Sequence, residues 1–175
     1  MKSSILLFAL LSANTALFAA EGHAHVHGVA KLDIAVESRK VSLHLDSPLD
    51  NLLGFERAPR TDAERRLADG AIAKLKAADA MFRFDPAAGC KSTKVELASA
   101  ALKLGSPDPA EAAQGHADID ADFEFECADA SKAAFVSVGL FQFARLQRLE
   151  VQVATPQGQF RRDLARPNVR IALTK

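Results

Sequence analysis

The stretch LDIAVESRKVSLHLD, residues 32–46, decides the fold of this chain. Apolar residues alternate with polar or small ones over 32–37 and again over 41–46, with Ser-Arg-Lys between the two runs. A period of two residues predicts half-buried strands, and the short connection predicts a β-hairpin. If Val36 lies opposite Val41, the apolar sets share one face and Asp33 lies opposite His44. We interpret His44 as a solvated partner of that carboxylate rather than as a metal ligand.

A second alternating stretch, HADIDADFEFEC at 116–127, predicts another strand with one apolar and one strongly acidic face. Placing His27 over His116 without a gap superimposes Ile34 on Phe123 and Asp33 on Asp122. The alignment indicates an internal two-fold repeat, with a histidine at the start of the equivalent strand in each half.

The chain between these stretches contains one main helix. Thr61 followed by Glu64 forms a capping box, and the Ala/Leu-rich segment continues to about residue 80. We expect the helix to turn one side to the core, formed by Leu67, Ala71, Leu75 and Ala78. Further strands are predicted within 82–90, 91–99, 135–141, 148–155 and 168–173, a loop at 105–115, and a short helical piece at 141–146. The fold class is therefore α+β, mostly antiparallel sheet with one main helix at about 61–80.

The first twenty residues, MKSSILLFALLSANTALFAA, have the layout of a secretory signal peptide. We expect cleavage after Ala19, which leaves residues 20–175 as a single α+β metal-binding domain of about 155 residues. The apolar run is shorter than the ~20 residues of a membrane-spanning helix. The chain is thus expected to be periplasmic, without a membrane span.

Charge and cysteine content narrow the function. The chain has 22 basic and 22 acidic residues, interspersed, so no basic cluster indicates a nucleic-acid partner. Its two cysteines, Cys90 and Cys127, favour a disulfide in an exported protein. It has no nucleophile elbow, no H-E-x-x-H motif and no phosphate loop, and we expect that it is not an enzyme.

The motif HAHVHG, residues 23–28, holds three of the five histidines. Alternate residues of a strand share one face, so His25 and His27 can approach one ion together. Zinc accepts imidazole nitrogens at about 2.0 Å in a tetrahedron. We predict a zinc site formed by His25 and His27, with His116 next and His23 assisting. Asp118 and Asp120 are candidate oxygen ligands, or carboxylates that hold a ligand histidine in its metal-binding tautomer.

Several segments resemble the ZrgA-like family of bacterial periplasmic zinc-binding proteins. They are HVHGVAKLDIAVES, LDSPLDNLLGFE, FEC, VSVGLF, RLEVQVATPQGQ and LARPNVRIAL, and together they span the mature chain. The resemblance implies a protein that captures or buffers zinc and assists its uptake, with zinc-uptake proteins of the periplasm or membrane as partners. Family members usually carry a long His/Asp-rich loop in mid-chain, where this chain has only GSPDPAEAAQGHADID with the single His116. That departure puts high-capacity zinc storage in doubt.

Two alternatives stay open. The chain could be a cell-envelope interaction module without a physiological metal, whose histidines are incidental. If cleavage falls after Ala20 instead, the mature chain begins Glu21-Gly22-His23, whose four nitrogens in a plane select Cu(II) or Ni(II) rather than zinc.

Overall fold

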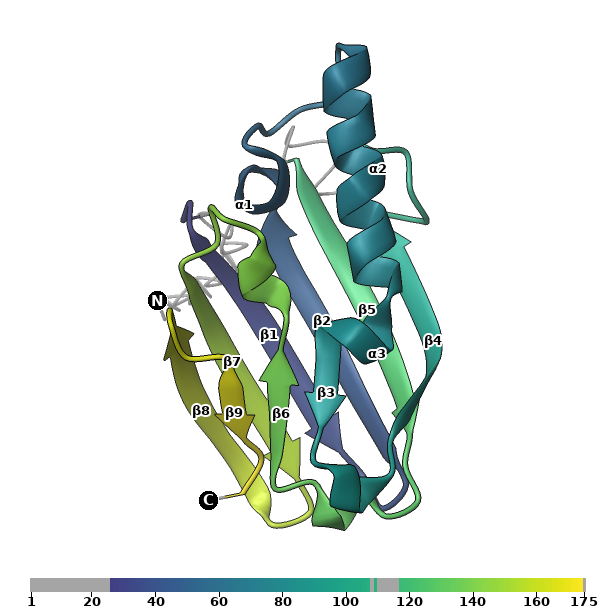
Figure 1. The fold of residues 1–175 in the computed structure, drawn as a ribbon, viewed down its shortest axis with the longest axis vertical. Helices are drawn as coiled ribbons and strands as arrows, with labels where there is room; N and C mark the ends of the chain where they lie inside the picture. The colour runs from purple at the N-terminus through teal and green to yellow at the C-terminus, as the bar shows by residue number, and fades with distance from the viewer. Residues whose placement is uncertain (1–25, 108, 110–116, 175) are drawn as a thin grey trace, which may run out of the picture.

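The computed structural model describes residues 26–107, 109 and 117–174. The predicted signal peptide lies outside these residues, as do His23, His25 and His116. The described residues form helices and mostly antiparallel sheets (Figure 1). This is the α+β class that the sequence predicts.

A six-stranded sheet forms the larger layer, in the order β4-β5-β2-β1-β7-β8. Its strands are β1 (Val29–Val36), β2 (Lys40–Pro48), β4 (Lys91–Ala98), β5 (Asp118–Glu126), β7 (Arg148–Thr155) and β8 (Gly158–Ala165). Neighbouring strands are antiparallel except β1 and β7, which are parallel. A smaller antiparallel sheet, in the order β3-β6-β9, consists of β3 (Phe82–Phe84), β6 (Phe135–Val138) and β9 (Arg170–Ala172).

The predicted hairpin register is confirmed. Val36 pairs with Val41, and Asp33 pairs with His44. On the other side of β2, strand β5 is also antiparallel to β2, and Asp122 lies opposite His44. The apolar residues of β1, β2 and β5 alternate onto one face because the period of a strand is two.

This register also accounts for the alignment of the two histidine-led stretches. Residues that the alignment superimposes, such as Asp33 and Asp122, pair with the same residue of β2 from opposite sides. The elements that follow differ, however, because β1 leads into its hairpin partner β2 while β5 leads to β6 in the smaller sheet. The similarity is therefore a property of two strands that flank β2 rather than of two equivalent halves.

The main helix, α2 (Asp62–Lys76), begins with the predicted capping box. Thr61 Oγ1 accepts from the backbone N–H of Glu64, and the Glu64 carboxylate accepts from the backbone N–H of Thr61. The helix ends earlier than expected, and the separate short helix α3 (Ala78–Met81) follows Ala77. The core face also differs, since Leu67 is 48% exposed and Ala68 is buried in its place. The N-terminal part of α2 extends beyond the end of the large sheet (Figure 1).

Three further differences from the sequence prediction concern short or weakly patterned elements. The sequence does not predict the five-residue helix α1 (Leu49–Leu53) or strand β8. The expected helical piece at 141–146 is a single 3₁₀ turn, η3 (Leu140–Gln142). In β8 the inward position between Phe160 and Leu164 is Arg162, whose guanidinium lies over the Phe160 ring at 4.5 Å. Arg162 interrupts the alternation of apolar and polar residues in the sequence, so the strand is hard to recognise. In the structure the aliphatic part of its side chain takes the place of an apolar residue. Two other 3₁₀ turns are η1 (Pro86–Ala88) and η2 (Ala130–Lys132).

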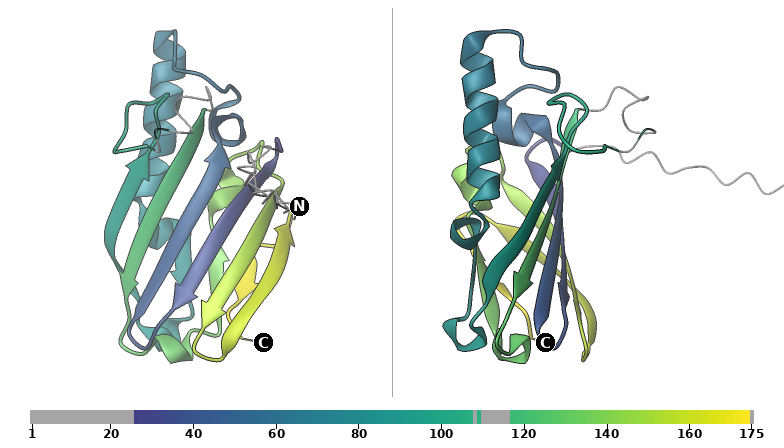
Figure 2. Two further views of the ribbon diagram at one scale, coloured as in Figure 1. Left: turned by 180° about the vertical axis from the view of Figure 1, so that it is seen from behind. Right: turned by 90° about the vertical axis from the view of Figure 1, so that its right-hand side faces the viewer.

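The helices and the smaller sheet lie on one face of the large sheet, and its other face carries none of the described helices (Figure 2). The hydrophobic core lies between the two layers. There Phe82 of β3 packs edge-on against Phe123 of β5, with ring centroids 4.8 Å apart. We call the opposite, helix-free surface the outer face.

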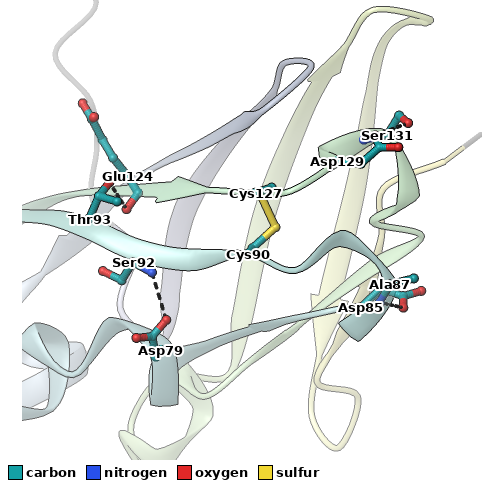
Figure 3. Close-up of a disulfide and its surroundings, with 10 residues drawn as sticks. All are labelled: Asp79, Asp85, Ala87, Cys90, Ser92, Thr93, Glu124, Cys127, Asp129 and Ser131. Atoms are coloured by element: carbon teal, nitrogen blue, oxygen red, sulfur yellow. Dashed lines mark hydrogen bonds between the residues drawn. A yellow bond between two sulfur atoms is a disulfide. The ribbon is translucent and has the colours of Figure 1, made fainter.

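The predicted disulfide between Cys90 and Cys127 is confirmed (Figure 3). Cys90 follows the η1 turn and Cys127 ends the acidic strand β5. The bond joins the beginning of β4 to the end of β5, where Thr93 Oγ1 also donates to the Glu124 carbonyl (Figure 3).

Candidate metal site

The backbone around His27, the last histidine of HAHVHG, is held by two other segments of the chain. The N–H of Gly28 donates to Asn51 Oδ1 at 2.6 Å, and Asn51 Nδ2 donates to the Val29 carbonyl at 2.8 Å. The Gly28 carbonyl accepts from the backbone N–H groups of Gln147 and Arg148. Gly28 has φ +83°, a conformation in which any side chain is strained, so glycine suits this turn into β1.

The His27 side chain lies between two carboxylates. Its Nε2 is 2.9 Å from Glu56 Oε1, and its Nδ1 is 4.0 Å from Asp50 Oδ2. Asp50 belongs to α1, whose C-cap Gly54 turns the chain with left-handed backbone angles toward Glu56. The His27 side chain is 62% exposed, so an ion from solvent can reach its ring.

Asp50 is itself held by a cation. The Arg145 guanidinium donates from Nε to Asp50 Oδ2 at 3.1 Å and from Nη2 to both carboxylate oxygens at 3.0 Å. The Asp50 side chain is only 9% exposed. A nearly buried carboxylate with a bidentate arginine partner keeps its geometry, so Asp50 holds a negative charge 4.0 Å from one His27 nitrogen while Glu56 faces the other.

The His27–Glu56 pair offers an imidazole nitrogen and a carboxylate oxygen, both of which zinc binds. Two zinc donors in a tetrahedron with bonds of about 2.0–2.1 Å are about 3.3 Å apart. The 2.9 Å pair reaches that separation when two partly exposed side chains open by a few tenths of an ångström. Within 26–107, 109 and 117–174, no three His, Cys, Asp or Glu side chains form a ready-made metal cluster. His27 and Glu56 therefore supply only part of a coordination shell.

The family comparison gives these observations their context. The model of the family described as ZrgA family zinc uptake protein matches residues 24–173. The chain belongs to this family. No curated protein matches the chain.

Two segments most specific to the ZrgA resemblance, HVHG and SPLDNLLGFE, meet in space. His27 and Gly28 come from the first, while Asp50, Asn51 and Glu56 come from the second. The sequence prediction used the second segment for the resemblance only and assigned no role to its carboxylates. Gly54, which follows two leucines, indicates a turn that could bring Glu56 back toward the helix. The sequence does not indicate its partner, because His27 is more than twenty residues away in the chain.

Asp118 and Asp120, the candidate oxygen ligands, lie elsewhere on the sheet. Asp118 opens β5 in register with Pro48, so β2 separates its strand from β1. Asp120 lies against His44, with Oδ1 at 4.0 Å from Nε2. Their predicted role around His116 falls on a residue outside the described part of the chain, and it stays a prediction.

His44 lies at the middle of the outer face. Its Nδ1 is hydrogen bonded to Asp122 Oδ1 at 2.8 Å, so the carboxylate it contacts is on β5 rather than Asp33, its register partner on β1. Burial lowers the pKa of His44, but the hydrogen bond to Asp122 and the charges of Asp122, Asp120 and Asp33 outweigh burial and raise it above 6.5. The ring lines a hollow of about 630 Å³ on this face.

Among the described residues, no helix combines the length and the apolar character that crossing a bilayer requires.

Proposed function

We propose that this ZrgA-family protein is an exported zinc-binding protein that captures or buffers zinc in the periplasm and assists its uptake by passing the ion to zinc-uptake proteins. The observation that carries the proposal is the His27–Glu56 pair, in which an imidazole nitrogen and a carboxylate oxygen lie 2.9 Å apart at an exposed turn. The pair is formed by two segments that distinguish the family. Binding and release of an ion require no chemical step, so an enzymatic role is not part of the proposal.

The proposed ligands are nitrogen donors of the amino-terminal motif together with one carboxylate. His25 and His27 are the principal ligands, His116 is next and His23 assists. Glu56 adds an oxygen donor, and Asp50, held by Arg145, keeps a carboxylate 4.0 Å from His27 Nδ1. Asp118 and Asp120 either add an oxygen ligand beside His116 or hold its ring in the metal-binding tautomer.

Zinc capacity is expected to be low. The mid-chain segment 105–120 has one histidine where family members usually have a long His/Asp-rich loop. We therefore expect one tight zinc event per chain rather than loop-based storage of many ions.

Export is part of the same proposal. Residues 1–19 act as a signal peptide, and residues 20–175 form the mature domain. Mass spectrometry of the exported protein identifies its amino terminus, and Ala20 as the first residue would remove the Glu21-Gly22-His23 motif on which the copper or nickel alternative depends.

The direct test is calorimetry of untagged, metal-free protein titrated with zinc. We expect the tight event to disappear in the His25→Ala/His27→Ala variant and to persist in His44→Ala, which removes a histidine from the outer face. Failure of the wild-type protein to bind zinc would favour the envelope interaction module. Equal affinity and stoichiometry in the double variant would reject the ligand assignment.

A further inference from the structure

The two edge strands of the large sheet are protected to very different degrees. Edge strand β4 carries a register shift between Ser92 and Lys94 and lysines at 91 and 94. Bulges, lysines, prolines and inward-pointing charges are the usual devices that keep a sheet edge from pairing with another chain. Edge strand β8 has an unbroken eight-residue register with β7, contains neither lysine nor proline, and carries one such device, the inward-facing Arg162. Within the described residues, β8 has a strand partner on one side only.

The hairpin between β7 and β8 determines which backbone groups face the open edge. A two-residue loop joins the closing pair Thr155 and Gly158. In such a hairpin the closing pair is hydrogen bonded, and hydrogen-bonded pairs then recur at every second residue. Phe160 and its even-numbered neighbours thus bond to β7. The residues between them turn their N–H and C=O groups outward, and these are Gln159, Arg161, Asp163 and Ala165.

The side chains of β8 are complementary to a second copy of the same strand. When two copies run antiparallel with Arg162 at the two-fold axis, Arg161 lies opposite Asp163 of the second copy, and Asp163 lies opposite the second Arg161. Within its own chain Arg161 forms an ion pair with Glu150, Nη2 to Oε2 at 2.8 Å, and the facing Asp163 joins that pair. On the inner face Phe160 lies opposite Leu164. Opposite charges and apolar side chains in directly facing positions both stabilise an antiparallel pair.

In the same register, the outward-facing N–H and C=O groups of the two β8 strands can hydrogen bond to each other. Each outward-facing residue, at 159, 161, 163 or 165, meets another outward-facing residue of the second copy, as an antiparallel ladder requires. The two Arg162 side chains approach the axis, but each guanidinium lies over its own Phe160 ring and reaches the Thr174 carbonyl at 3.5 Å. Their charges are therefore drawn away from the axis on the inner face.

We propose that β8 is a dimerisation edge, through which two copies of this chain pair antiparallel and join their large sheets into one continuous sheet. The contact is isologous, as a two-fold dimer requires. The proposal is independent of zinc binding, because none of the proposed zinc ligands lies on β8.

Sedimentation equilibrium of the metal-free mature chain at low ionic strength tests this arrangement by charge reversal. We expect Arg161→Asp and Asp163→Arg each to raise the dimer Kd about tenfold or more, since each places like charges opposite one another twice. The Arg161→Asp/Asp163→Arg variant restores opposite charges across the contact and should lower the Kd relative to either single reversal. Lys94→Glu on edge β4 is the matched control and should leave the Kd unchanged.

Amide hydrogen exchange locates the contact. The outward N–H groups of Arg161 and Asp163 should become protected as the wild-type concentration rises and should stay unprotected in Arg161→Asp. Unfolding curves of each variant verify that the monomer is folded. A wild-type chain that remains monomeric up to about 1 mM, or a dimer that neither single reversal weakens, would overturn the proposal.

Discussion

Glu56 is a proposed zinc ligand that the sequence alone did not indicate. Its Oε1 lies 2.9 Å from His27 Nε2. Replacing Glu56 by glutamine removes the negative charge and the better oxygen donor while the size of the side chain is kept. We expect zinc affinity to fall about tenfold, measured by calorimetry.

Glu124→Gln is the matched control for this change. The Glu124 side chain is 36% exposed and that of Glu56 is 37% exposed, and each has one cationic or imidazole partner. Zinc affinity should be unchanged in Glu124→Gln. An equal loss in both variants would mean that general surface charge, rather than Glu56 as a ligand, attracts the ion.

His44 should make stability depend on pH in a defined direction. Its pKa is raised in the folded protein, because its contacts with Asp122, Asp120 and Asp33 outweigh burial. A raised pKa means that the folded state holds the proton more tightly than the unfolded state. The stabilisation is therefore complete below a pH of about 6.5 and is lost as the pH rises through the folded pKa.

Two measurements check this behaviour. The difference in unfolding free energy between wild type and His44→Gln should be larger at about pH 5.5 than at about pH 8.5. In an NMR titration, Asp122→Asn should lower the pKa of His44, whereas Glu126→Gln on the same strand should change it much less. A pKa of His44 that is the same in wild type and Asp122→Asn would contradict the assignment.

At the scale of secondary-structure elements, Asn51 connects α1 to the beginning of β1. Its side chain is fully buried and bonds to the Gly28 N–H, the Val29 carbonyl and Ser47 Oγ. Asn51→Ala leaves these polar groups without their partner, so we expect a loss of about 2 kcal/mol in the free energy of unfolding. Chemical denaturation measures it, with the exposed Asn168→Ala as the control that makes the same chemical change.

The same variant should also weaken zinc binding, because Asn51 holds the turn that carries His27. A destabilised protein that keeps wild-type zinc affinity at a temperature where it is folded would show that this turn does not position the ligand.

At the scale of the whole molecule, the disulfide closes the loop between Cys90 and Cys127, which are 37 residues apart in sequence. Removing it with a Cys90→Ala/Cys127→Ala variant should lower the free energy of unfolding by about 4 kcal/mol in the loop-entropy model. Urea unfolding of oxidised wild type and the double variant measures the difference. A loss below about 1 kcal/mol would mean that the unfolded chain is already compact in this region.

Local patterns in the sequence were enough for the parts of the fold that depend on neighbouring residues. The hairpin register with Asp33 opposite His44, the capping box of Thr61 and Glu64, and the acidic outer side of β5 all follow from periodicity within a few residues. The pairing of Cys90 with Cys127 follows because the chain has two cysteines only.

Tertiary structure alone decided what joins distant segments. The parallel pairing of β1 with β7, the exposure of Leu67 and the contact of His44 with Asp122 depend on which elements become neighbours, which no local period encodes. The candidate site shows the same division. The histidines of HAHVHG stand out in the sequence by their spacing, whereas Glu56 and the Asp50–Arg145 pair reach His27 only because α1 and the turn before β7 pack against the beginning of β1.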